Sequence, residues 1–142
     1  MTPAPFASTF VAIALIPVAF LFVHAYLSGR KKNRLHPVTG LAAIAWDLSV
    51  SIGYMLYRTF GGAVNGETLN MSPAMNAYFM VVHVPVAIVV MSLEIVVLAT
   101  GFLWLRLKKG ARIHSKLVAP LFYIWWFAFL SGEILYIILY LV

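Results

Sequence analysis

Seven side chains in this sequence could bind a metal or carry protons, although most of the chain around them is apolar. They are four histidines and three acids: His24, His36, His83, His114, Asp47, Glu94 and Glu133. Imidazoles bind heme iron and transition metals, and carboxyl groups carry protons. Ionisable groups are costly in lipid, so we expect such side chains to face the interior of a protein.

The stretch from Tyr78 to Gly101 combines two of these groups. His83 and Glu94 are eleven residues apart, about three helical turns, so both fall on nearly the same face of a helix. Met80 lies one turn before His83, and a thioether beside an imidazole suits copper(I). An outer copper site of Met80 and His83 is therefore one hypothesis. Methionine is also ordinary filler in apolar helices, which is the alternative.

The same eleven-residue spacing relates His36, Asp47 and Arg58, with Tyr54 close to their face. Asp47 would lie near the middle of a membrane, where a carboxyl group must be protonated or hydrogen-bonded. One interpretation is a buried polar network of Asp47, Arg58, Glu94 and Glu133. The other is that Asp47 simply joins its helix to neighbouring helices.

His36 and His114 occupy equivalent places, each just after a basic loop at the start of an apolar block. Together with His24 they form a possible histidine cluster, and two imidazoles from different helices could hold heme b. The alternative is that His36 and His114 cap helices and meet lipid phosphates, while His24 lies at headgroup depth. The chain contains no cysteine, which excludes covalent c-type heme, disulfides and thiolate metal sites.

Composition identifies the elements that must position these groups. The 142 residues are 63% hydrophobic and only 10% charged, more apolar than a soluble domain of this length can hide. Four apolar blocks are each long enough to cross a bilayer as a helix. We predict an all-α fold, a single four-helix transmembrane domain over residues 1–142, with spans at about 6–28, 36–58, 76–105 and 115–141.

Charge placement predicts the orientation. Nine of the ten basic residues lie in two short loops, Arg30–Arg34 and Arg106–Lys116. The positive-inside rule places both loops in the cytoplasm, with both termini and the loop from Thr59 to about Asn76 outside the inner (cytoplasmic) membrane. The net charge of +6 is thus a topology signal, and the basic turns have no aromatic surface that would bind nucleic acid.

No motif for a nucleotide phosphate loop, a zinc protease, a dinucleotide or a catalytic nucleophile occurs. We therefore expect no enzyme activity of its own, at most a role as subunit of a membrane oxidoreductase. Three functions stay open: an accessory protein of a membrane complex, a small b-type cytochrome passing electrons between a quinone and a partner through a heme on His24, His36 or His114, and a proton-conducting element built on the three acids.

An ordered set of residue types runs through the last three spans: His36, Tyr54, Tyr57, His83, His114, Lys116, Trp125, Gly132 and Tyr136. Over residues 35 to 142 the chain thereby resembles a family of small four-helix membrane proteins that includes the bacterial heme-copper oxidase maturation factors YozB and CtaM. It departs from the family at Arg58, where a further histidine is usual, at the acids Asp47 and Glu133, and at the added His24.

The resemblance implies a part in making, stabilising or accompanying a terminal oxidase. It implies a non-catalytic accessory subunit or maturation factor of a respiratory complex that contains heme or copper. Its partners would be the lipid bilayer and other integral membrane subunits.

Overall fold

Four helices of membrane-spanning length form the described part of the chain, and no strand occurs there. The computed structural model describes residues 5–60 and 72–142. The helices are α1 (Phe6–Arg30), α2 (His36–Thr59), a 35-residue span composed of α3 (Pro73–Tyr78), η1 (Phe79–His83) and α4 (Val84–Leu107), and α5 (Ala111–Tyr140). The prediction of an all-α bundle with four candidate membrane spans is confirmed. The predicted loop after Thr59 is cut short by α3, and its residues 61–71 lie outside the described residues.

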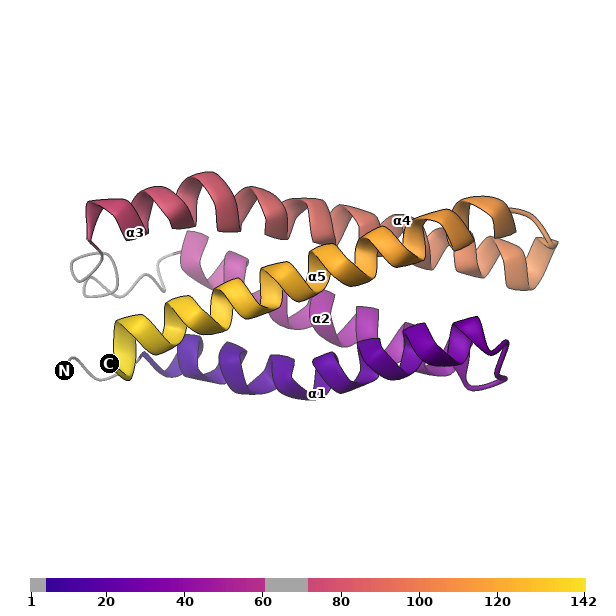
Figure 1. Ribbon diagram of the computed structural model, residues 1–142, viewed down its shortest axis with the longest axis horizontal. Coiled ribbons are helices and arrows are strands. Elements are labelled where there is room, and N and C mark those ends of the chain that lie inside the picture. Colours follow the sequence, from indigo (N-terminus) through magenta and orange to yellow (C-terminus); the bar gives the residue numbers. More distant parts are fainter. Residues whose placement is uncertain (1–4, 61–71) are drawn as a thin grey trace.

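The helices run antiparallel to their chain neighbours (Figure 1). Both termini lie at one end of the bundle, together with the end of α2 and the start of α3; we call this the terminal end. The α1–α2 and α4–α5 turns lie at the opposite end, which we call the basic end because it carries Arg30–Arg34 and Lys108–Arg112. The basic residues are therefore gathered on one side of a structure long enough to cross a bilayer.

Local sequence explains where the helices begin and end. Pro37 lies in the first turn of α2, and the Ser72 hydroxyl accepts a hydrogen bond from the Met75 amide at 3.2 Å to cap α3. The α4–α5 turn uses left-handed backbone at Lys108 (φ 56°) and Gly110 (φ 84°). Glycine adopts that conformation without steric cost, so the chain can reverse direction within a few residues.

The third span is interrupted by the π-helical turn η1, which immediately precedes Val84 and Pro85. Proline has no N–H and its ring clashes with the carbonyl four residues earlier, which for Pro85 is Val81 within η1. A wider turn relieves that clash and changes the register of the helix. The direction of His83 is therefore set by η1 rather than by regular α-helical spacing.

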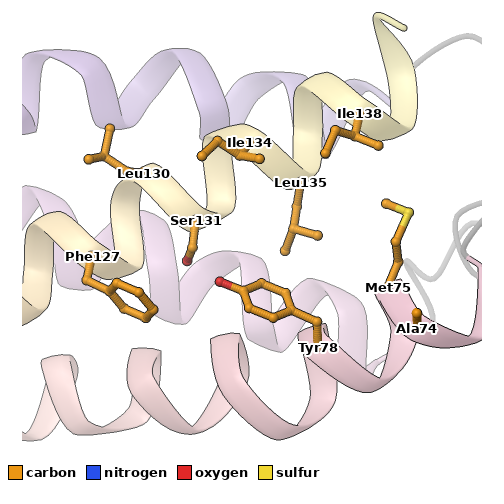
Figure 2. Close-up of a pocket in the computed structure, with 9 residues that line it drawn as sticks. All are labelled: Ala74, Met75, Tyr78, Phe127, Leu130, Ser131, Ile134, Leu135 and Ile138. Carbon is orange, nitrogen blue, oxygen red and sulfur yellow. The ribbon is translucent and has the colours of Figure 1, made fainter.

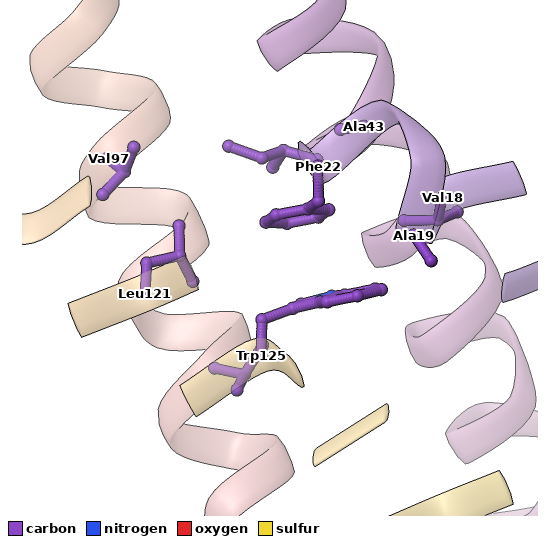
Figure 3. Packing of buried hydrophobic residues seen from close by; sticks show 9 residues of the cluster. Val18, Ala19, Phe22, Ala43, Val97, Leu121 and Trp125 are labelled. Carbon is purple, nitrogen blue, oxygen red and sulfur yellow. The ribbon is translucent and has the colours of Figure 1, made fainter. Parts of the chain in front are cut away.

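The helices enclose an aromatic core at mid-length. α1 packs against α2 and α5, and α4 packs against the same two helices, so α2 and α5 face each other across the bundle. Trp125 of α5 stacks on Phe22 of α1, with ring centres 4.4 Å apart, and on Phe129 at 5.2 Å. Figure 3 shows Phe22 and Trp125 lying flat against each other between the helices. Trp125 is 2% exposed, so this stack is the centre of the core.

We expect Trp125→Phe to destabilise the bundle by about 1–3 kcal/mol, because the smaller ring keeps the stack but leaves buried Asp47 without its N–H donor. Trp126→Phe is the matched control, since Trp126 is only partly buried and its ring has edge contacts. Equilibrium unfolding in mixed micelles, followed by circular dichroism, measures both. Equal losses in the two variants would contradict a special role for the Trp125 N–H.

Candidate functional site

Two imidazoles meet inside the basic end of the bundle. The ring centres of His36 and His114 are 6.0 Å apart, with the ring planes inclined at 70°. His36 is the first residue of α2 and His114 lies in the first turn of α5, so the pair joins two helices on opposite sides of the bundle. The site therefore spans the bundle interior.

His36 is held in place by α1. Its Nδ1 is 2.9 Å from the carbonyl oxygen of Ala25. A carbonyl oxygen can only accept, so Nδ1 carries a proton and donates it, and the Nε2 of the neutral ring keeps a free lone pair. Gly29 provides the space for this ring, because a Cβ there would come within 2.8 Å of it. The Ala25 carbonyl and Gly29 together fix the tautomer and position of His36.

His114 is held in the same way by α4. Its Nδ1 lies 3.0 Å from the carbonyl oxygen of Val97 and 3.5 Å from the Thr100 hydroxyl. A Cβ on Gly101 would be 3.1 Å from the ring, so glycine again provides the necessary space. His114 is buried, and the Trp104 ring lies 6.1 Å away. The two histidines therefore share one arrangement: a backbone carbonyl on Nδ1 and a glycine against the ring.

This arrangement is found both in buried structural histidines and in histidines that bind metals. A ligating imidazole commonly donates its other N–H to a backbone carbonyl, which fixes the tautomer and raises the basicity of the binding nitrogen. Among the described residues no group of three or more His, Cys, Asp or Glu side chains gathers for a metal. The pair therefore offers two protein ligands.

A second polar group, Asp47 with Glu94, occupies the middle of the bundle. Asp47 is 4% exposed and accepts a hydrogen bond of 3.1 Å from the Trp125 indole. Glu94 is fully buried, and its carboxyl group interacts electrostatically with that of Asp47. Among the described residues, the interaction partner of the Glu94 carboxyl group is the carboxyl group of Asp47. This agrees with the expected inward direction of Glu94.

His83 lies nearer the terminal end, on the face of η1 that meets α5. Its Nδ1 is 2.9 Å from the Ser131 hydroxyl, and a Cβ on Gly132 would be 3.1 Å from its ring. Met80 is 57% exposed, so its side chain faces outward while His83 faces Ser131. The described contacts thus place the two residues of the hypothetical copper site on different faces of the span.

The remaining predicted site residues lie apart from these groups. His24 is exposed on α1 and lines a groove with Pro17 and Trp46, away from the His36–His114 pair. Arg58 lies over the Tyr54 ring at 5.9 Å and is about 16 Å of helix from Asp47. Glu133 is half-buried beside Gly132. The predicted polar network had four members. The described contacts bring two of them together, Asp47 and Glu94.

Sequence reasoning missed the roles of Gly29 and Gly101, which we had expected only to end a helix or to lie within one. A signal was present in retrospect: Gly29 is seven residues before His36, and Gly101 is thirteen before His114, each across a short turn. No family model, characterised protein or solved structure matches the chain.

We expect Gly29→Ala and Gly101→Ala to lower the free energy of unfolding by about 1–3 kcal/mol, because each added methyl meets an imidazole ring that is hydrogen-bonded in place. Gly40→Ala is the control, since a Cβ there meets nothing within 4 Å and alanine favours helix. Unfolding midpoints in detergent measure all three. Stabilisation at Gly29 or Gly101 like that at Gly40 would contradict close packing of the rings.

Proposed function

We propose that this chain is an integral membrane accessory protein, a small subunit or maturation factor of a respiratory complex that contains heme or copper. Its His36–His114 pair holds or passes on the metal centre. The observation that carries the proposal is the matched environment of the two rings, each with Nδ1 on a backbone carbonyl of another helix and with a glycine beside it.

The donor set fits both groups that the resemblance implies. His36 and His114, each with Nδ1 at a backbone carbonyl, would hold heme iron or copper(I) through Nε2. A bound heme would supply one-electron redox chemistry at this position. The contribution of the protein is to fix two ligands from α2 and α5, while Val97 and Ala25 keep both rings in the binding tautomer.

A small b-type cytochrome is the second candidate, and one observation favours it. The two histidines come from two different helices, α2 and α5, on opposite sides of the bundle, and these two residues would hold a heme between helices. In this alternative the heme stays with the chain permanently and carries electrons to a partner.

Spectroscopy and metal analysis of the gently solubilised protein test the proposal and separate the candidates. We expect heme or copper to bind the wild-type chain at one equivalent, and binding to fall at least tenfold in His36→Ala and in His114→Ala. His24→Ala is the matched control and should bind as the wild type does, because His24 lies in a separate, exposed groove. A reduced-minus-oxidised spectrum of the same samples detects a b-type heme.

The outcomes are distinct. A b-type band that stays with the isolated chain supports the cytochrome. Copper or heme that exchanges readily, with other membrane subunits recovered beside the chain, supports the accessory protein. Equal binding in wild type and in both histidine variants would overturn the use of the pair in either function.

We also propose the membrane orientation that the basic residues predict, in which the basic end of the bundle lies in the cytoplasm. The chain has no cysteine, so a single introduced cysteine is the only thiol of the chain that a maleimide can label. We expect Lys31→Cys and Lys109→Cys to react with a membrane-impermeant maleimide only in inverted vesicles, and Val142→Cys only in intact cells from which the outer barrier has been removed. The reverse labelling pattern would contradict this orientation.

A further inference from the structure

Asp47 and Glu94 meet at the middle of the bundle and take no part in the proposed metal site. Both are buried, and their carboxyl groups interact with each other. Apart from Asp47, no described residue offers a hydrogen-bond donor to the two Glu94 oxygens. Ionised carboxyl groups can only accept hydrogen bonds, and two of them repel each other strongly in an apolar interior. A proton must therefore lie between these two side chains.

The contacts of Asp47 indicate which residue carries this proton. Asp47 accepts the 3.1 Å hydrogen bond of the Trp125 indole and also interacts with the Ser51 hydroxyl, and both donors stabilise a carboxylate. Glu94 has no comparable donor, so Glu94 is the protonated partner and donates to Asp47.

The surroundings favour a proton over a metal ion at this place. The described residues that interact with the two carboxyl groups include no basic side chain and no third acid or histidine. At this level α1 and α5 contribute the aromatic rings of Phe22 and Trp125. A metal cation would need more oxygen ligands than two carboxyl groups supply, whereas a single proton needs one donor and one acceptor.

Apolar residues separate the carboxyl pair from the basic end, where the paired histidines lie. Ala43 and Ile44 are buried one turn before Asp47 on α2, and Val97 is buried one turn after Glu94 on α4. Leu121 of α5 belongs to the same packed cluster. The described side chains at this level therefore offer no polar path for a proton towards the basic end.

Hydroxyl groups line the opposite direction, towards the terminal end. Ser51 lies one turn beyond Asp47 on α2 and is half-buried, and Tyr54 follows almost one turn later. The Tyr54 hydroxyl is 3.1 Å from the Ser8 hydroxyl, near the start of α1, and Arg58 lies over the Tyr54 ring. A hydroxyl group both donates and accepts, so it can take up one proton as it gives up another. α2 thus provides a polar path between the carboxyl pair and the terminal end.

The opposite wall of the bundle lacks such a path in its described part. Val90 is buried one turn from Glu94 on the side of the terminal end. Figure 2 shows the groove between α3 and α5, whose walls are apolar except for the hydroxyls of Tyr78 and Ser131. The residues described as lining this groove include neither carboxyl group. The path along α2 is therefore the one that the described side chains favour.

We propose that Asp47 and Glu94 form a proton-binding site inside the membrane, which exchanges its proton with the side of the membrane at the terminal end. Glu94 holds the proton, and Asp47 accepts its hydrogen bond. Ser51 and Tyr54 pass the proton between Asp47 and the terminal end, each hydroxyl accepting one proton as it releases another. The packed apolar cluster closes the site towards the basic end.

Infrared spectroscopy of the detergent-solubilised chain tests the site, because the C=O band of a protonated carboxyl group is separate from the amide bands. We expect such a band at neutral pH, a shift of the band in D2O, and its loss in Glu94→Gln. In Asp47→Asn the band remains but moves to higher frequency, because a neutral amide accepts a hydrogen bond less strongly than a carboxylate does. Glu133→Gln changes an acid of α5 and is the matched control, which keeps the Glu94 band.

The rate at which this band shifts after mixing with D2O tests the path. We expect exchange to be about five- to tenfold slower in Ser51→Ala and in Tyr54→Phe, the change expected for one lost hydrogen bond. Ser49→Ala is the control variant and should exchange as the wild type does. Ser49 is exposed on α2, and its hydroxyl is bonded to the Ala45 carbonyl of its own helix.

Four results would each overturn the proposal. They are the lack of a protonated carboxyl band in the wild type, a band that survives in Glu94→Gln, a band unmoved in Asp47→Asn, and exchange in Ser51→Ala and Tyr54→Phe as fast as in Ser49→Ala. None of them bears on metal binding by the paired histidines.

Discussion

A polar side chain within a membrane-spanning helix must find its partner inside the protein, because hydrocarbon offers none. This constraint orders the interior of the bundle. His36 and His114 find carbonyls of α1 and α4, Asp47 finds the Trp125 indole, and His83 finds Ser131. Each of these bonds joins two helices, so the polar residues connect the bundle as well as line it.

Because the polar residues recur every eleven residues, these contacts form successive layers along the length of the bundle. His36, Asp47 and Arg58 follow one another on α2, while His114, Trp125 and Tyr136 follow at the same spacing on α5. The paired histidines thus lie at the basic end and Asp47 with Trp125 at mid-length, and Tyr136 bonds Thr9 at 2.9 Å near the terminal end. About 16 Å of helix separates successive layers, so each layer can act as a separate site.

Much of this arrangement could be predicted from the sequence, because apolar length gives the spans and three-turn spacing gives shared faces. The inward direction of Glu94 and Asp47 and the proximity of His36 to His114 follow from that reasoning. Other features could not be predicted. The apolar surface of α5 hides which face is buried, so the sequence does not distinguish Trp125, which forms the core, from the partly buried Trp126. The π-helical turn before Pro85 changes the local register, which is why Met80 and His83 lie on different faces.

The central claim is that His36 and His114 are prepared as two ligands for one metal centre. Nitrogen-15 NMR of histidine-labelled protein in micelles measures it most directly, since the shifts report the protonation of each ring nitrogen and Ala variants assign the signals. The account predicts Nδ1–H tautomers for both residues in the metal-free protein, and a simultaneous shift of both Nε2 signals at one equivalent of copper(I), with His24 unaffected. Nε2–H tautomers, or a shift of one of the two residues alone, would contradict it.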